Sequence, residues 1–261
     1  ENTTSQGTAT VTGNTVSGSV TSSTVTSTRE RPDATIVRLP PNTVEFLFEG
    51  LDKGVPESGL ESQPYMRSLP VEVARHPDTL LAYEMNGETL TLDHGFPLRL
   101  IVPDWYGMAS VKWLTAITAI TQSFKGYFQR NRYVFRDFIG NEKPVREIKI
   151  KSHITFPQHK MKLNSEIVRL SGFALSGRSA IESVEISVDG GKAWKTADLV
   201  GPSHKYSWQQ WQFVWAPSRP GHHTILSKAR DQEGNVQPLQ SEWNQLGYAV
   251  NGCKPICVEV V

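Results

Sequence analysis

Residues 183–194, SVEISVDGGKAW, indicate how the second half of this chain folds. Val184 and Ile186 alternate with polar residues, as they do in a strand that has one buried and one solvated face. The Gly190-Gly191 pair that follows favours a tight turn. This strand is one of five candidates with turns between them: residues 167–173, 181–188, 208–215, 224–229 and 256–260. Several short strands separated by turns predict a β-sandwich.

The first half is also rich in strand signals, with a less regular spacing. Residues 80–85 and 88–92 flank Asn86-Gly87, the strongest short-range signal for a β-hairpin, because both turn residues tolerate positive φ. Three further segments have a strand-like composition: residues 43–48, 96–102 and 110–120. We therefore expect a strand-rich unit ahead of the sandwich.

One short helix is expected among these strands, at residues 71–75. Ser68 is the expected N-cap, since a serine hydroxyl accepts hydrogen bonds from the N–H groups of the first turn. Pro70 is expected in the first turn, where a missing N–H leaves no hydrogen bond unmade.

The first 34 residues differ in composition from the rest. Sixteen of residues 1–28 are Ser or Thr, and the first aromatic residue is Phe46. A segment with so little apolar surface does not offset the entropy of ordering it, so we expect a disordered leader. Its Thr-Val alternation leaves an edge strand open as the alternative. The predicted domains are a leader, residues 1–34, a strand-rich domain, residues 35–145, and a sandwich, residues 146–261.

Composition excludes several classes of protein. The chain has 261 residues, with 27 Lys and Arg against 26 Asp and Glu, so its formal net charge is +1. This near-balance argues against a nucleic-acid binder, which usually shows a clear basic excess. No apolar run approaches the roughly 20 residues of a membrane helix, and no signal-peptide pattern is visible. We expect a soluble chain, with its compartment left open.

Four polar side chains lie close together in the sequence among apolar neighbours. His94, Arg99, Ser110 and Lys112 offer an imidazole, a guanidinium, a hydroxyl and an ammonium group. Convergent donors of this kind suit a phosphate or another anion. The alternative is that the two cations are strand residues that face solvent.

Long runs around these donors resemble the sulfite oxidase family of molybdenum enzymes. They are residues 80–87 (LLAYEMNG), 93–103 (DHGFPLRLIVP) and 110–114 (SVKWL). Residues 183–194 and 243–248 (WNQLGY) resemble that family's immunoglobulin-like dimerisation domain. The resemblance covers roughly residues 44–261. It implies the C-terminal part of an α+β molybdopterin domain followed by an all-β immunoglobulin-like sandwich, strand-rich overall.

The resemblance also implies roles for individual residues. By motif position, the segment that holds the pterin and its phosphate contains His94, Arg99, Ser110, Val111 and Lys112. The cofactor implied is molybdenum–molybdopterin. This agrees with the anion site inferred from the donors alone.

A tyrosine is the implied catalytic residue. Residues 63–70 (QPYMRSLP) resemble the stretch that supplies the family's active-site tyrosine, which places Tyr65 beside the substrate pocket. A tyrosine there can donate a hydrogen bond to an oxo group or a substrate oxygen. The alternative is an aromatic residue that packs on a neighbouring strand.

Two departures from the family pattern bear on activity. The family's metal is held by one cysteine that precedes the strand matched here by residues 44–48, whereas the first cysteine of this chain is Cys253. Where some members have an arginine that helps to bind the oxyanion substrate, this chain has Gln209 and Gln210. We expect no metal ligand in this chain and interpret Cys253 and Cys257 as two free thiols.

These observations predict a molybdopterin-dependent oxidoreductase that transfers an oxygen atom to sulfite or a related sulfur oxyanion. The implied partners are a second copy of the chain, bound through the sandwich, and an electron acceptor such as a cytochrome or a haem domain. No nucleic acid and no membrane span are expected. Because the metal-binding cysteine half is missing, the chain is expected to be an inactive fragment on its own. The alternative is a non-catalytic interaction module with a degenerate cofactor domain and a Ser/Thr-rich stalk.

Overall fold

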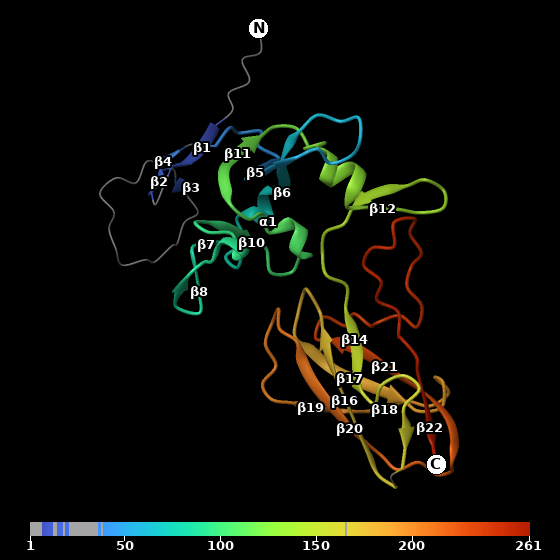
Figure 1. Cartoon of the computed structure of the whole chain (residues 1–261). Helices are drawn as coiled ribbons and strands as arrows, with labels where there is room; N and C mark the ends of the chain where they lie inside the picture. The colour runs from blue at the N-terminus through green and yellow to red at the C-terminus, as the bar shows by residue number, and fades with distance from the viewer. Residues whose placement is uncertain (1–6, 13–14, 18, 21–35, 38, 165) are drawn as a thin grey trace. The chain divides into compact units, whose positions relative to one another are not determined.

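The computed structural model describes residues 7–12, 15–17, 19–20, 36–37, 39–164 and 166–261. The chain divides into two compact units (Figure 1). The first contains Glu1–Phe135 and Glu142–Arg146, and the second contains Arg136–Asn141 and Glu147–Val261. The main division falls after Arg146, one residue from the predicted boundary.

The main sheet of the first unit has five strands in the order β2-β1-β11-β5-β6, and each neighbouring pair is antiparallel. These strands are β1 (Gly7–Thr12), β2 (Thr15–Ser17), β5 (Glu45–Gly54), β6 (Gln63–Pro70) and β11 (Leu114–Ile120). The alternating apolar residues of β5 place its two phenylalanines on the buried face. The sheet thereby supplies one wall of an apolar core.

That core is completed by the loops that precede β11. Its buried members are Phe46, Phe48, Leu69, Leu98, Leu100, Val102, Trp105, Ala109, Val111, Leu114 and Ala119. The shorter elements of the unit are β3 (Ser19–Val20), β4 (Ile36–Val37), α1 (Val71–Ala74), β7 (Leu80–Ala82), β8 (Glu84–Met85), β9 (Glu88–Thr89), η1 (Leu92–His94), β10 (Arg99–Ile101), η2 (Gly107–Ala109), the π-helix η3 (Phe128–Arg132), β12 (Val134–Arg136) and β13 (Glu142–Pro144).

The predicted hairpin is confirmed. Strands β8 and β9 pair antiparallel, and the turn between them has Asn86 at φ 56° and Gly87 at φ 82°. Both residues therefore occupy the left-handed region that this turn requires. The hairpin is short, with two paired positions, Glu84↔Thr89 and Met85↔Glu88.

The predicted helix cap is wrong. Helix α1 begins after Pro70, without a side-chain hydrogen bond at its N-terminus. Ser68 lies inside β6, because the strand continues as far as Pro70, and its N–H and hydroxyl groups bond to Gln129 instead. The helices are all short, and among the described residues none has the length and apolar character to cross a membrane.

Part of the predicted leader has a place in the main sheet. Strand β1 pairs with β11 over Gly7↔Ala119 to Thr10↔Ala116, and β2 pairs with β1. This is the edge-strand alternative raised by the Thr-Val alternation, since an extended polar segment can complete the hydrogen bonds of an open sheet edge. Most other residues of the predicted leader lie outside the described residues.

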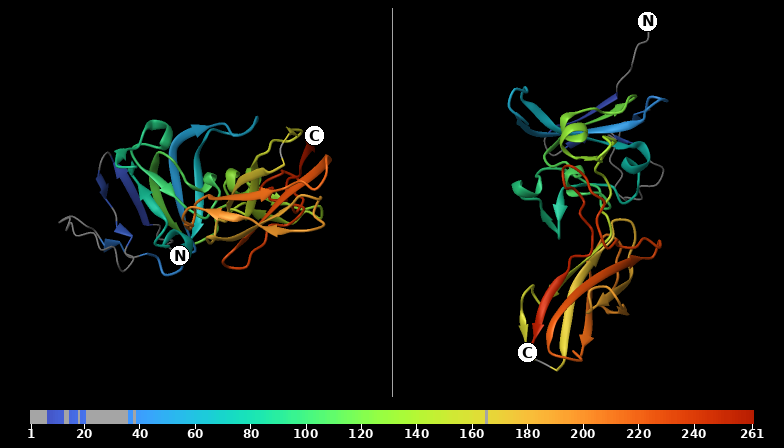
Figure 2. Two further views of the ribbon diagram at one scale, coloured as in Figure 1. Left: turned by 90° about the horizontal axis from the view of Figure 1, so that it is seen from below. Right: turned by 90° about the vertical axis from the view of Figure 1, so that its right-hand side faces the viewer.

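The second unit is the predicted sandwich (Figure 2). One sheet has the order β14-β16-β20-β19 and the other β15-β22-β21-β17-β18. Their bounds are β14 (Lys151–Phe156), β15 (Lys162–Leu163), β16 (Val168–Leu175), β17 (Ile181–Ser187), β18 (Lys195–Thr196), β19 (Asp198–Val200), β20 (Gln209–Trp215), β21 (Gly221–Asp231) and β22 (Ile256–Val260). The five strands predicted from alternation correspond to β16, β17, β20, β21 and β22.

The sandwich has an apolar core cluster, with buried polar residues such as Asp231 and Gln237 beside it. Leu170, Trp211 and Ile225 have no exposed surface and come from both sheets. Gly172 makes room for the indole, because a Cβ there would clash with the Trp211 ring and with the His153 carbonyl. The immunoglobulin-like fold class is thus confirmed for this half of the chain.

Candidate functional site

The candidate site begins at a left-handed glycine. The 3₁₀ turn η1 ends at Gly95, which has φ 101°. A Cβ at this position would lie 3.0 Å from Cβ of Lys112 and 3.1 Å from Cβ of Arg99. Only glycine accommodates both this conformation and this approach. The turn therefore lies directly against the two predicted cationic residues.

Backbone carbonyl groups of that turn orient the two cations. Arg99 Nη1 donates to the carbonyl of His94 at 3.0 Å, and Lys112 Nζ donates to the carbonyl of Asp93 at 3.0 Å. A second arginine nitrogen, Nη2, lies 3.5 Å from the carbonyl of Ser110. Residues 19 positions apart in sequence, Asp93 and Lys112, are thus brought together.

The positive charges of this cluster are not neutralised by carboxylates. Within the part of the chain that the structure describes, neither Arg99 nor Lys112 forms an ion pair. The Nε atom of Arg99 is buried and has no hydrogen-bond partner. Burial lowers the pKa of Arg99, yet a guanidinium stays charged at neutral pH. An unmet donor beside two cations that lack a carboxylate partner suits an anion such as a phosphate.

The other predicted cofactor residues lie around the same turn. The exposed His94 ring shares a 2.8 Å hydrogen bond with the Thr91 hydroxyl, and the Ser110 hydroxyl accepts from the N–H of Val102 at 3.1 Å. Val111 differs, since its side chain is 1% exposed and belongs to the apolar core. The structure thus brings four polar residues together and places the fifth residue beneath them.

Tyr65 approaches this cluster from β6. Its hydroxyl donates to the carbonyl of Met108 at 2.6 Å, and its ring lies 4.8 Å from that of Phe128. Met108 is in η2, immediately before the Ser110–Lys112 segment, so the tyrosine and the cationic cluster share one loop. Burial raises the pKa of the Tyr65 hydroxyl well above its ordinary value, and the positive charge of Arg67 acts in the opposite direction. The hydroxyl therefore keeps its proton at neutral pH.

Sequence reasoning missed a buried polar group next to Tyr65. Arg67 is 1% exposed, and its Nη1 donates to the carbonyl of Phe128 at 2.7 Å. Gln129 is also buried; it accepts from the N–H of Ser68 at 3.1 Å and donates to that hydroxyl at 2.7 Å. These bonds fasten η3 to β6. The signal in the sequence was a charged residue two positions from Tyr65, hence on the same face of the strand.

Gln209 and Gln210, which stand where the resemblance implies an arginine in some members, offer no charge. Gln209 is 3% exposed, and its Nε2 donates to the carbonyls of Val200 and Gln210 at 2.9 and 3.0 Å. Gln210 is exposed on the neighbouring position of β20. Neither residue supplies a cation.

Both cysteines lie in the second unit and are free, as predicted. Cys253 is buried, and its Sγ lies 3.4 Å from the carbonyl of Pro238. Burial raises the pKa of this thiol, which disfavours the thiolate that binds metals. Among the residues that the structure describes, no three His, Cys, Asp or Glu side chains gather as metal ligands.

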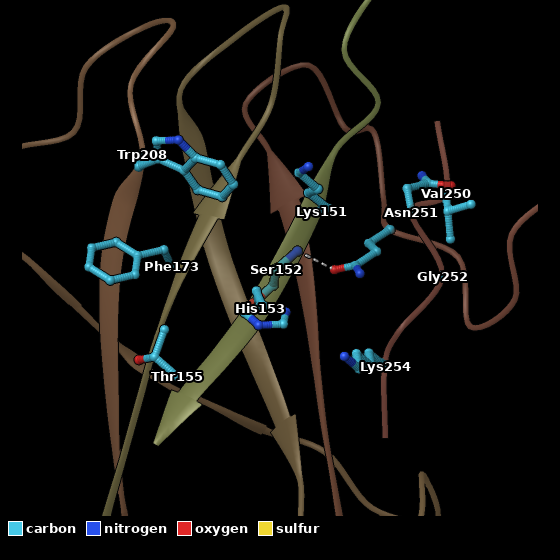
Figure 3. A pocket seen from close by; sticks show the side chains of 11 residues that line it. Lys151, Ser152, His153, Thr155, Phe173, Trp208, Val250, Asn251, Gly252 and Lys254 are labelled. Atoms are coloured by element: carbon cyan, nitrogen blue, oxygen red, sulfur yellow. Dashed lines mark hydrogen bonds between the residues drawn. The ribbon is translucent and has the colours of Figure 1, made fainter. Parts of the chain in front are cut away.

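A separate hollow of about 570 Å³ lies on the sandwich beside β14 (Figure 3). Lys151 and Trp208 line it, with the ammonium 5.5 Å from the indole ring. Trp208 is half exposed, whereas Trp211 and Trp215, further along the same segment, are buried. The hollow contains none of the predicted site residues.

Two domain families match the chain. Residues 12–128 match the oxidoreductase molybdopterin binding domain, and residues 142–258 match the Mo-co oxidoreductase dimerisation domain. The first match includes Tyr65 and all five predicted cofactor residues. The second covers the sandwich.

Individual relatives point the same way. The chain is 35% identical over 242 residues to mitochondrial sulfite oxidase of Mus musculus, covering 86% of this chain and 43% of that protein. It is 35% identical over 224 residues to sulfite oxidase of Arabidopsis thaliana, covering 77% of this chain and 56% of that protein. The crystal structure of the sulfane dehydrogenase SoxCD from Paracoccus pantotrophus is similar, with a TM-score of 0.72 and 26% identity over 86% of this chain and 56% of that one. The chain thus spans about half the length of these relatives.

Proposed function

Because this chain belongs to the sulfite oxidase family of molybdopterin oxidoreductases, we propose that it forms the phosphate-binding side of a molybdenum–molybdopterin site. The cofactor of the family is molybdenum–molybdopterin. The enzyme that contains this chain is proposed to oxidise sulfite or a related sulfur oxyanion. One observation carries the proposal: Gly95 allows Arg99 and Lys112 to converge with no carboxylate between them.

The residues present fit the cofactor's phosphate. The carbonyl groups of His94 and Asp93 hold the two cations in place, and the buried Nε of Arg99 still lacks an acceptor. A guanidinium donates to two phosphate oxygens at once, and hydrogen bonds to charged groups contribute about 1.5–3 kcal/mol each. Arg99, Lys112, Ser110 and His94 are therefore proposed to hold the pterin phosphate, and the buried Val111 supports them from the core.

When bound, molybdenum–molybdopterin supplies a redox centre at which an oxygen atom and two electrons are transferred. Tyr65 is proposed to face the substrate. Its pKa is raised by burial, so it acts there as a hydrogen-bond donor and not as a base. The hydroxyl has one proton, which it donates to the Met108 carbonyl in this structure, so we propose that a substrate oxygen replaces that carbonyl as the acceptor. Its role is to orient a substrate oxygen.

We propose that neither cysteine of this chain binds the metal. Cys253 is buried in the second unit with a raised pKa, and Cys257 lies exposed on β22. The given residues before β5 include no cysteine. We propose that these residues alone, without a thiolate for the metal, bind the pterin weakly and turn over no sulfite.

The second unit belongs to the family's dimerisation domain. We propose that it joins two copies of the chain through an isologous contact. A cytochrome or haem domain is the proposed electron acceptor. Light scattering at micromolar concentration is expected to show a dimer, and a monomer alone would contradict the assembly.

The whole protein that carries this chain provides the test of function. Molybdenum and pterin content, together with sulfite-dependent reduction of an acceptor, should be measured for the native protein and three variants. Arg99→Ala is expected to lower cofactor occupancy about tenfold, since it removes a charge-assisted contact. Tyr65→Phe should retain the cofactor and lower turnover, and Arg132→Ala, an exposed arginine on η3, should behave as native. Native protein without molybdenum and without sulfite oxidation would overturn the proposal.

A further inference from the structure

Arg67 is a fully buried charge on the same face of β6 as Tyr65. Its side chain is 1% exposed, and the two residues are separated by one position in an extended strand. A buried charge is costly unless opposite charge or several hydrogen bonds surround it. Its environment therefore needs an explanation.

The contacts of Arg67 leave its charge uncompensated. Nη1 donates to the carbonyl of Phe128 at 2.7 Å, and the guanidinium lies 5.8 Å from the ring of Tyr133. Its Nε is buried without a hydrogen-bond partner. Of the ion pairs formed by the described residues, none includes Arg67. One carbonyl and one ring do not neutralise a full positive charge.

A second arginine adds to this charge. Arg146 is half buried, with its guanidinium 5.5 Å from the ring of Trp105, and it forms no ion pair within the described ranges. Its positive charge, together with burial, lowers the pKa of Arg67. The one carboxylate that acts on the Tyr65 hydroxyl is that of Asp52, which is exposed to solvent. Arg146 thus adds positive charge beside Arg67, and Arg67 in turn acts on the Tyr65 hydroxyl.

We propose that Arg67, assisted by Arg146, supplies the positive charge that draws an anionic substrate to Tyr65. This inference rests on the proposed function, because it takes Tyr65 as the residue that faces the substrate. Arg67 is a specificity-determining residue that acts at a distance, since its buried side chain does not reach a ligand.

The physical basis is the weak screening of buried charge. A charge inside the protein acts through a lower effective dielectric constant than one at the surface, and salt screens it less. An unpaired buried cation therefore raises the local concentration of anions and strengthens their binding. A neutral ligand gains nothing from it. The charge of Arg67, and not its shape, is what matters.

The test uses the whole protein with its cofactor and sulfate as an oxyanion that does not react. Arg67→Gln removes the charge, Arg67→Lys keeps it, and Arg132→Gln removes an exposed charge from the neighbouring π-helix. Sulfate affinity is measured by calorimetric titration, and KM and kcat are measured for sulfite. Arg67→Gln should weaken sulfate binding and raise the KM about tenfold, with kcat within about twofold. Arg67→Lys and Arg132→Gln should remain within about threefold of native.

Two results would overturn the inference: native-like sulfate affinity in Arg67→Gln, or equal losses in Arg67→Gln and Arg67→Lys. Should Arg67→Gln fail to fold, Arg146→Gln replaces it, with an expected loss of about threefold to fivefold; an unchanged affinity there would also overturn the inference. A native protein that binds sulfate but oxidises no sulfite would refute the proposed function and leave the charge argument standing. A native protein that binds no sulfate would refute the charge argument, whatever its activity.

Discussion

The two units bury different kinds of side chain. The sandwich is filled by apolar residues such as Leu170, Trp211 and Ile225, and its most buried carboxylate, Asp231, is surrounded by donors. The first unit buries Arg67, which lacks a carboxylate partner among the described residues, beside a half-buried tyrosine. Buried side-chain atoms without a hydrogen-bond partner occur in both units, but among the described residues those of charged groups, Arg67, Arg99 and Arg130, all lie in the first.

This difference in how buried charges are bonded distinguishes residues that stabilise a fold from residues that are able to bind a ligand. Buried polar groups that are fully bonded contribute rigidity, whereas unmet ones weaken a fold and tend to be found at functional sites. On this reasoning we expect the sandwich, whose most buried carboxylate is fully bonded, to act as a scaffold. We expect Arg67 and Arg99, whose buried Nε atoms lack partners, to take part in binding. Substitutions in the two units should therefore have different consequences.

The largest expected loss of stability follows from Trp211→Ala. The indole has no exposed surface and packs against Gly172, where no side chain can replace it. Truncation of a buried tryptophan leaves a cavity and should lower the free energy of unfolding of the sandwich by about 4 kcal/mol. Urea denaturation followed by circular dichroism measures this loss.

Trp208→Ala is the matched control, because the same residue type is half exposed there. Its expected loss is below about 1 kcal/mol. Equal losses for the two tryptophans would contradict the assignment of Trp211 to the sandwich core.

The next effect concerns Asp231, whose side chain is fully buried in β21. Burial alone would raise its pKa, but hydrogen bonds from the Ser176 hydroxyl at 2.7 Å and from Asn235 outweigh burial and hold the pKa below the ordinary value. The folded carboxyl therefore binds protons less readily than the unfolded one. Its contribution is present above the unfolded pKa of about 4 and is lost as pH falls through the folded pKa.

Asp231→Asn should accordingly lower the free energy of unfolding by about 3 kcal/mol at pH 7, since hydrogen bonds to a charged group contribute about 1.5–3 kcal/mol each. The difference between native and variant should shrink as the pH is lowered from 5 to 2. Urea titrations at several pH values measure it. A difference that stays constant over this range would show that the charge of Asp231 does not stabilise the sandwich.

The sandwich was the more predictable half because its signal is local. Alternation such as Val184 and Ile186 reports directly on which face of a strand is buried, and five strands were located this way. Edge strands such as β14 and β19 were missed. Lys151–Phe156 mixes polar and apolar residues, so its pairing depends on β16 and not on its own pattern.

The site was predicted only as far as its donors lie close in sequence. Residues 93–112 could be grouped from the sequence because they follow one another closely along the chain. Arg67 and Gln129 are 62 positions apart, and their shared environment arises from the packing of η3 on β6. Ser68 shows the same limit, since its expected role as a helix cap is replaced by a bond to a residue 61 positions away.

A smaller effect tests that long-range contact. Gln129→Ala leaves the buried N–H of Ser68 without an acceptor and the hydroxyl without a donor, which should lower the free energy of unfolding by about 2 kcal/mol. The double variant with Ser68→Ala should lose less than the sum of the two single losses, because the partners act as one unit. Additive losses in urea denaturation would refute the coupling of β6 to η3.

The smallest expected effect on stability is that of Tyr65→Phe, and it completes the contrast between the two units. The substitution keeps the ring against Phe128 and removes only the hydroxyl that donates to the Met108 carbonyl. A single neutral hydrogen bond contributes about 1 kcal/mol, so the free energy of unfolding should fall by no more than that. Turnover of sulfite by the whole protein should fall about a hundredfold, because the hydroxyl is proposed to orient the substrate oxygen. Urea denaturation and steady-state kinetics on the same preparation separate the two effects. A loss of stability above about 2 kcal/mol with native turnover would place Tyr65 with the scaffold residues and not with the site.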